Sequence, residues 1–274
     1  MSRPRRPGRH RQPRRSQVPP RTDDGRPLST TKDALDAAGQ KPLINTRPST
    51  KKNYAERFSR AIAQCIANRL RDTFPGIKPD EDGGGQESLA RTAKGFKKLD
   101  VNYSTPELGL ALGVSVKSIN FPDWSEARQR TGRFTKNYSR NDNELRAEPT
   151  DYHQRQPYSI LVGVLFLPDD AYRDAVLPTA RGEERGVSSF GASVRFFRPR
   201  AGRKTPRNDV DLFERFFIAV YNEETGRTCF FDVMKPPPRA RPLRPEECML
   251  FDDFIQEIIK TYNERNNPPF QWAE

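Results

Sequence analysis

KLDVNYSTPELGLALGVSVK, residues 98–117, is the stretch that decides the expected fold. It predicts two neighbouring strands, over about 96–103 and 108–119. In the second strand large apolar residues alternate with small ones, so Leu112 and Val116 face one way while Ser115 and Lys117 face the other. The first face suits a core. The second face suits a cleft, because small residues let a ligand approach the backbone closely.

Two functional groups, Asp100 and Lys117, belong to this pair of strands. Phosphodiester hydrolysis needs a hard cation that neutralises developing charge and activates water. Mg²⁺ prefers carboxylates and keeps several waters, so one to three acidic residues are enough. A nearby lysine stabilises the phosphate in the transition state. The pair predicts a Mg²⁺ site, with Mn²⁺ as a substitute. The structural alternative is a turn aspartate and a lysine that protects a strand end.

The rest of the sequence predicts further helices and strands. A helix is expected from Ser49 or Thr50 to about Phe74, followed by a loop over 77–90. A second helix is expected from Asn141, with a break favoured at Pro149. The continuous apolar run over 158–167 predicts a strand covered on both faces. Also predicted are a strand over 193–197, a hairpin of 213–221 with 227–233, and a final helix over 246–263.

The N-terminal region differs in composition from the rest of the chain. Residues 1–48 are rich in Arg, Pro, Ser and Thr and have few large apolar side chains. Such a segment buries too little surface to offset chain entropy, so it is predicted to be a disordered basic tail. Residues 49–274 are predicted to form a single domain, with a core over about 51–167 and a C-terminal elaboration over 168–274.

The charge balance favours a polyanionic partner. Lys and Arg outnumber Asp and Glu by 48 to 36, for a formal net charge of +12. Nine arginines lie in the first 27 residues, and the remainder carries 39 basic against 34 acidic residues. The body is therefore only mildly basic. A basic chain of this kind is typical of nucleic-acid binding, and a solubilising tail is the alternative.

Cysteine, histidine and hydropathy patterns argue against several classes of protein and of functional site. Cys65, Cys229 and Cys248 show no paired spacing, which argues against a disulfide framework or structural zinc and is typical of a cytoplasmic protein. With only His10 and His153, two-histidine mechanisms are excluded, and no G-x-S-x-G motif favours a serine hydrolase. No apolar segment is long enough to span a membrane, and no secretory signal is recognised.

The predicted order of helix, strand, strand, helix and strand resembles the core of the PD-(D/E)xK nuclease superfamily. Similarity to restriction-endonuclease-like proteins is greatest over Lys98–Ser118 and Asn137–Leu167. The resemblance implies an α/β fold with a mixed sheet and an αβββαβ core, here extended by a C-terminal hairpin and helix. It also implies a Mg²⁺-dependent endonuclease of restriction type that cuts double-stranded DNA in bacterial restriction or phage defence. A homodimer and a defence-system partner protein are expected with it.

The sequence departs from the family pattern at Ser115. The family usually has an acidic residue two positions before the lysine, whereas serine supplies no charge there. Some members place serine at this position and take the second carboxylate from the following helix. Glu144 is therefore the preferred replacement, Glu107 is its competitor, and Glu56 is a further candidate ligand or water-orienting acid. Their structural alternative is an ordinary surface glutamate.

A second set of residues is predicted to contact DNA. Basic residues interleaved with aromatic ones can grip a phosphate backbone and stack on bases, and the run from Trp124 to Arg140 has this composition. The predicted DNA-binding residues are Arg128, Arg130, Arg133, Lys136, Arg140, Arg146, His153 and Gln154. For each, a solvated surface or helix-end role is the alternative.

Two other functions compete with the nuclease prediction. The first is a protein of nuclease fold that binds nucleic acid without cutting, which Ser115 in place of an acid favours. The second is an interaction protein whose Arg-rich tail docks on an acidic partner.

Overall fold

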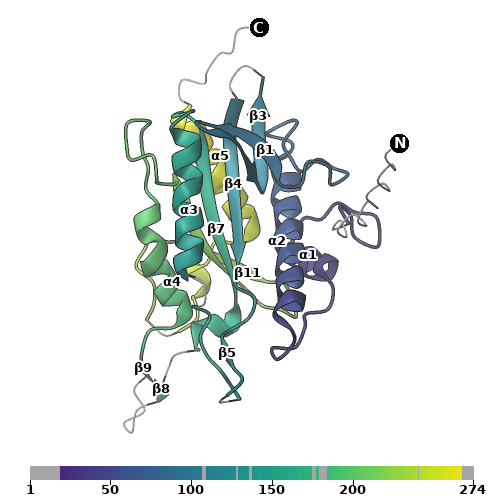
Figure 1. Cartoon of the computed structure of the whole chain (residues 1–274), viewed down its shortest axis with the longest axis vertical. Coiled ribbons are helices and arrows are strands. Elements are labelled where there is room, and N and C mark those ends of the chain that lie inside the picture. The colour runs from purple at the N-terminus through teal and green to yellow at the C-terminus, as the bar shows by residue number, and fades with distance from the viewer. Residues whose placement is uncertain are drawn as a thin grey trace, which may run out of the picture.

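The computed structural model describes residues 19–106, 109–127, 129–135, 138–174, 177–178, 184–239 and 241–266. Its centre is a mixed five-stranded sheet in the order β11-β10-β7-β4-β3 (Figure 1). The strands are β3 (Val101–Thr105), β4 (Gly109–Ser118), β7 (Ile160–Pro168), β10 (Arg215–Tyr221) and β11 (Thr228–Asp232). The inner strands β4, β7 and β10 are parallel, and the two edge strands are antiparallel to their neighbours. The predicted mixed α/β class is therefore confirmed.

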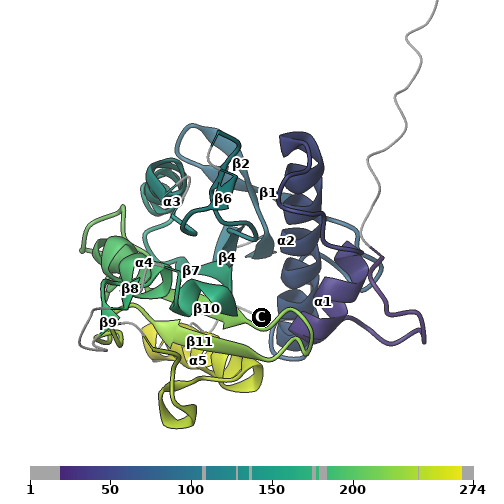
Figure 2. The same cartoon turned by 90° about the horizontal axis from the view of Figure 1, so that it is seen from below.

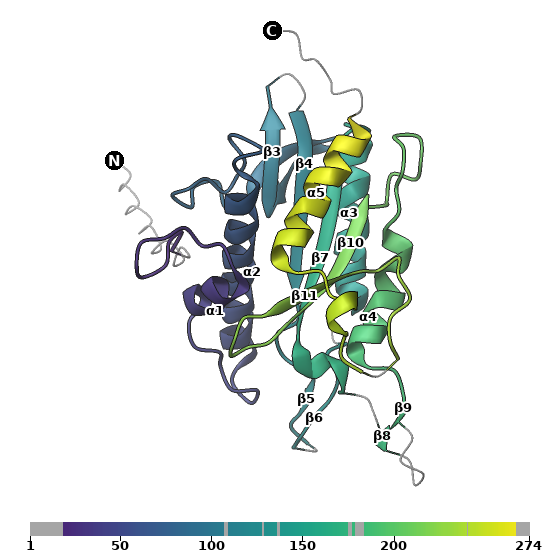
Figure 3. The same cartoon turned by 180° about the vertical axis from the view of Figure 1, so that it is seen from behind.

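Helices cover both faces of the sheet. One face, with Val114 of β4 and Val162 of β7, packs against α2 (Pro48–Leu70) and α5 (Phe251–Arg265). The other face, with Leu161 and Leu165 of β7, packs against α3 (Tyr138–His153) and α4 (Ser189–Phe197). Accordingly α3 lies in front of the sheet in Figure 1 and α5 lies in front of it in Figure 3. Every residue of β7 is buried, which explains its continuous apolar sequence.

The strand predicted over 96–103 is two strands that separate at Asp100. β2 (Gly95–Leu99) pairs with β1 (Ser88–Thr92) in a hairpin of its own, whereas β3 pairs with β4. The loop predicted over 77–90 ends where β1 begins. Asp100 thus lies at the junction between a peripheral hairpin and the central sheet, and the predicted second strand agrees with β4 within one residue at its C-terminal end.

Part of the predicted disordered tail is folded. α1 (Thr31–Ala38) has a capping box in which the Thr30 side chain accepts from the Asp33 N–H. Its buried Ala34 and Leu35 belong to the same hydrophobic core as α2, and Asn68 of α2 donates to the Leu28 carbonyl at 2.9 Å. The prediction of disorder is wrong for residues 19–48, because few but well-spaced apolar residues were enough to dock them. Residues 1–18 lie outside the described residues. Figure 2 shows α1 beside α2.

The structure corrects two further predictions, one about the extent of α3 and one about the segment that forms α4. α3 begins at Tyr138 and continues through Pro149, because Tyr138, Leu145 and Tyr152 recur every seven residues and are all buried against the sheet. The segment 193–197, predicted as a strand, belongs to helix α4. Its buried Phe190, Val194 and Phe197 have helical spacing, and the Ser188 side chain caps it.

The remaining element boundaries differ from prediction mainly at helix ends. α2 has Arg47 as its N-cap, without a side-chain hydrogen bond, so Ser49 and Thr50 lie inside the helix. α5 starts at Phe251 after a short 3₁₀ turn over Pro245–Glu247. The hairpin β10–β11 is confirmed. The short paired segments are β5 (Trp124–Ser125) with β6 (Arg130–Thr131), and β8 (Leu177–Pro178) with β9 (Glu184–Arg185).

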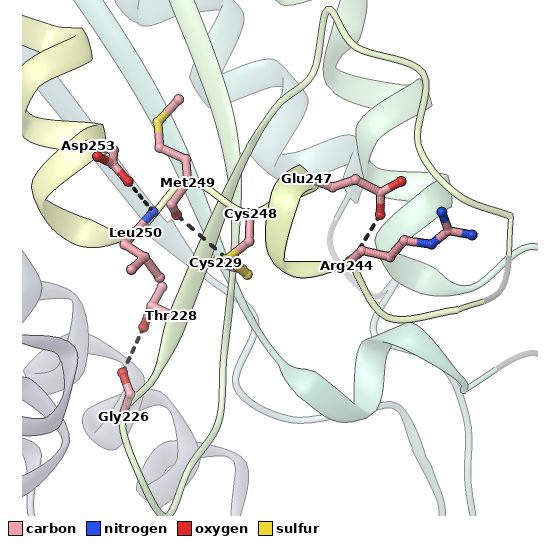
Figure 4. Close-up of a disulfide and its surroundings, with 9 residues drawn as sticks. All are labelled: Gly226, Thr228, Cys229, Arg244, Glu247, Cys248, Met249, Leu250 and Asp253. Carbon is pink, nitrogen blue, oxygen red and sulfur yellow. Dashed lines mark hydrogen bonds between the residues drawn. A yellow bond between two sulfur atoms is a disulfide. The ribbon is translucent and has the colours of Figure 1, made fainter.

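A disulfide joins Cys229 of β11 to Cys248, just before α5 (Figure 4). The prediction that the cysteines do not pair is wrong. Although the two cysteines are 19 positions apart in the sequence, the neighbouring residues Phe230 and Met249 form a β-bridge that brings them together. Disulfides persist mainly in oxidising environments, so the cysteine pattern no longer supports a cytoplasmic location. Cys65 is free and buried.

No helix in the described part of the chain combines the length and apolarity needed to cross a membrane.

Candidate functional site

Asp100 and Lys117 lie on the same face of the sheet. Val101 pairs with Val114 and both side chains point to the α2 face, so Asp100 and Ser115, one position along, point to the α3 face. Lys117 shares that face because it is two residues from Ser115 on β4. The Val116 N–H donates to Asp100 Oδ2 at 2.7 Å, which fixes the carboxylate against the strand that carries the lysine.

Lys117 contacts two glutamates of α3. Its Nζ lies 2.9 Å from Glu148 Oε1 and 3.6 Å from Glu144 Oε2. Glu144 and Glu148 are one helical turn apart and therefore share a face. The structure thus brings the predicted Glu144 to the site, but the closer and more deeply buried glutamate is Glu148, which sequence reasoning missed. The signal that could have found it is its i+4 spacing from Glu144 on a helix that continues to His153.

Negative charge exceeds positive charge in this cluster. Displacement of water by the surrounding protein raises the pKa of Asp100 to about 6, and the attraction of Lys117 opposes that rise while Glu148 adds to it. Burial lowers the pKa of Lys117, but the Glu148 and Asp100 carboxylates more than offset this and raise it above its usual value. The one buried ammonium group, that of Lys117, therefore faces the carboxylates of Asp100, Glu144 and Glu148, while the exposed Arg140 pairs with Glu144 at 3.0 Å.

Three buried polar atoms on this face have no hydrogen-bond partner: Ser115 Oγ, Glu148 Oε2 and the Tyr152 hydroxyl. Burial and the nearby Glu148 raise the pKa of Tyr152, so this hydroxyl stays protonated. Unpartnered buried polar atoms are costly and usually indicate a missing water, ion or ligand. Glu148 Oε2 can only accept, whereas the two hydroxyls can each accept or donate, which suits a hydrated cation.

The fit to Mg²⁺ rests on two carboxylates. Among the described residues, no group of three or more His, Cys, Asp or Glu side chains is placed to hold a metal ion. Mg²⁺ is commonly bound by only one or two carboxylates together with waters and substrate phosphates. Asp100 and Glu148 supply two, and the unpartnered Glu148 Oε2 leaves one oxygen free for a cation. The donor set therefore suits a Mg²⁺ ion that keeps most of its waters rather than one enclosed in a complete protein cage.

The other predicted acids take different places. Glu56 lies on α2, on the opposite face of the sheet, and pairs with Lys52 at 3.6 Å. Glu107 lies outside the described residues. Glu87, which sequence reasoning did not select, adds to the negative field at Asp100 while pairing with Arg60 and Lys98.

The predicted DNA-binding residues are scattered. Arg128 and Lys136 lie outside the described residues, as does the side chain of Arg130. Arg140 and Arg146 are exposed and pair with Glu144 and Asp211, and Gln154 is exposed. Arg133 donates to the Val187 carbonyl. His153 is fully buried and its Nδ1 lies 3.1 Å from the Val210 carbonyl, so the prediction that it contacts phosphate is wrong for this structure.

A groove of about 730 Å³ opens at the carboxyl end of β4, where α2 and α3 begin. Ser118 and Asn120, which directly follow Lys117, line it, and so does Asn141 of α3, one turn before Glu144. Its basic side chains come from the start of α2, and Trp124 and Phe121 supply aromatic surface. The basic residues are Arg47, Lys51 and Lys52. In open α/β sheets ligands usually bind outside the carboxyl ends of parallel strands.

No family model, no curated protein and no solved structure matches this chain.

Proposed function

We propose that this protein is a Mg²⁺-dependent nuclease whose site is formed by Asp100, Lys117 and Glu148. The observation that supports this most is that one lysine and an excess of carboxylates share the α3 face of β4, directly before a basic groove. Nucleic acid is the substrate class because the groove combines cations for phosphates with aromatic rings for bases.

The residues have distinct roles in this proposal. Asp100 and Glu148 would hold Mg²⁺, which when bound neutralises charge on the phosphate and lowers the pKa of water. Lys117 donates to a phosphate oxygen and stabilises the charge that develops there. The Lys117 side chain is 20% exposed, so its ammonium group can contact a phosphate while the residue stays in β4. Glu144, the more exposed of the two glutamates, releases Lys117 most easily when phosphate arrives.

The groove orients the strand that is cut. Lys52 and Arg47 are exposed and suited to backbone phosphates, whereas Lys51 is held by the Ile44 carbonyl at 2.7 Å. Trp124 offers a ring on which a base can stack. Double-stranded DNA, a role in restriction or phage defence, a homodimer and a defence-system partner extend the proposal on the strength of the family resemblance.

A second candidate function is nucleic-acid binding without cleavage. Two observations favour it: Ser115 stands where the family usually has an acid, and Lys117 already satisfies Glu148 at 2.9 Å. In that case the groove binds DNA and the acidic cluster is structural.

Plasmid cleavage in Mg²⁺ or Mn²⁺ distinguishes these functions. The wild type, Asp100→Asn, Lys117→Met and Glu148→Gln variants are compared, with Glu56→Gln as the matched control on the other face of the sheet. The nuclease proposal expects cleavage by the wild type and the control and a loss of about 100-fold or more in the other three. Cleavage retained in all variants contradicts the site. Salt-sensitive DNA binding without cleavage by the wild type supports the second function.

A further inference from the structure

A second buried charge cluster lies at the C-terminal end of α3, where His153 approaches Glu214. Glu214, just before β10, is almost fully buried and its Oε1 accepts from both Arg203 Nη1 and Arg265 Nη2 at 3.1 Å. Its Oε2 accepts from the Leu161 N–H at 2.7 Å and lies 3.6 Å from His153 Nε2. Two guanidinium groups therefore share one carboxylate, which leaves at least one positive charge without a buried counter-charge.

The unpaired charge is accompanied by unpaired hydrogen-bond donors. Arg203 Nε and Arg265 Nη1 are buried without an acceptor. The side chains of Arg203 and Arg265 are 0% and 10% exposed. Backbone carbonyls accept from the other nitrogens, Arg203 donating to Pro157 and Pro206 and Arg265 to Arg203. A guanidinium group can only donate, so the two remaining nitrogens call for an acceptor, and the excess positive charge favours an anion.

An adjoining cavity of about 650 Å³ is large enough for such a ligand. Arg203, Arg265 and Glu214 line it, together with Lys204, whose side chain forms no ion pair within the described part of the chain. Arg215 also lines it but is paired with Asp232 and Glu257. Glu264, the other acidic lining residue, is paired with Lys260 at 3.8 Å. The remaining wall includes Met234 and Pro206, which suit the uncharged part of an ester.

We propose that this cavity binds a phosphate group, carried by a small phosphorylated molecule or present as free phosphate. Arg265 and Lys204 contact the phosphate oxygens, and Arg203 supports them from the buried side. A phosphate dianion fits better than a single carboxylate because three basic groups converge on one cavity. This proposal uses none of the residues of the Asp100 site and stands whether or not the protein cuts DNA.

Isothermal titration calorimetry tests the proposal with inorganic phosphate, ribose 5-phosphate and ribose as probes. Saturable binding of ribose 5-phosphate but not of ribose is expected. Arg265→Gln is expected to weaken binding about tenfold or more, and Lys204→Gln, which changes an exposed residue and leaves the buried cluster intact, severalfold. Lys94→Gln, at an exposed lysine between β1 and β2 and outside the cavity lining, is the matched control and should bind like the wild type.

Comparing the affinities of ribose 5-phosphate and inorganic phosphate distinguishes the two possible sources of the phosphate group. Tighter binding of ribose 5-phosphate than of phosphate identifies a phosphate ester as the ligand, and equal binding identifies free phosphate. The proposal is overturned if neither anion binds, or if Lys94→Gln loses as much affinity as Lys204→Gln. Circular dichroism of each variant shows whether a loss of affinity reflects misfolding. If Arg265→Gln is misfolded, the affinity of Lys204→Gln tests the proposal, because that variant leaves the buried cluster intact.

Discussion

The two buried charge clusters of this protein are opposite in sign. Near one end of β4, Lys117 faces the carboxylates of Asp100, Glu144 and Glu148, so the cluster lacks positive charge. Around Glu214, two guanidinium groups share one carboxylate, so that cluster lacks negative charge. Both contain buried polar atoms without partners: a carboxylate oxygen and two hydroxyls in the first, and guanidinium donors in the second. The comparison indicates that each cluster is completed by a ligand of opposite charge.

The largest expected effect is on the positive cluster. Glu214→Gln should lower the free energy of unfolding by about 3–5 kcal/mol, because Arg203 and Arg265 would be buried without their shared carboxylate. Urea unfolding at pH 7 measures this. Glu264→Gln, at the rim of the same cavity, should change stability by less than about 0.5 kcal/mol. Equal losses in both variants would show that the buried cluster is not the source of the effect.

A smaller effect is expected for the single cation of the negative cluster. Lys117→Met should lower the free energy of unfolding by about 2–3 kcal/mol at pH 8, because Glu148 would lose its partner. At pH 5 the loss should be smaller, since Asp100 is then largely protonated and one repulsive charge is removed. Urea unfolding at the two pH values provides the test. An equal loss at both pH values would mean that the charge of Asp100 does not interact with the charges of Lys117 and Glu148.

Asp100 itself should reduce stability at neutral pH. Its pKa in the folded protein, about 6, is above the unfolded value of 3.8, so the folded state binds more protons between these values. Stability from this group is therefore present below pH 4 and is lost as the pH rises through 6. Asp100→Asn removes this loss and should stabilise the protein above pH 6 by about 1–2 kcal/mol, after allowance for partial solvent exposure. A variant less stable than wild type at pH 8 would contradict this account.

The sequence predicted the part of the site that depends on local alternation. The alternating residues of β4 placed Ser115 and Lys117 on one face, whereas the break at Asp100 in the strand predicted over 96–103 was not foreseen. Glu148 was missed because Pro149 favours a helix break, whereas burial of Tyr138, Leu145 and Tyr152 holds α3 continuous across it. That tertiary contribution is not visible in a local pattern.

Features built from distant segments were beyond prediction. The Glu214 cluster unites residues of α3, α5 and the segments before β10, and the Cys229–Cys248 disulfide depends on a β-bridge between Phe230 and Met249. The helical face of Phe190, Val194 and Phe197 was taken for a strand because a short apolar run fits either period. Likewise, the apolar residues of α1 were too few to predict docking without knowledge of the α2 surface.

The most direct test of the central claim is Mg²⁺ binding to the negative cluster, measured by thermal unfolding at pH 8 without DNA. We expect Mg²⁺ to raise the melting temperature of the wild type and of Glu56→Gln by a few degrees, because a ligand that binds only the folded state stabilises it. In Asp100→Asn this shift should disappear, while binding of phosphate is unchanged. An equal Mg²⁺ shift in Asp100→Asn, or none in the wild type, would contradict the assignment of Asp100 to a cation site.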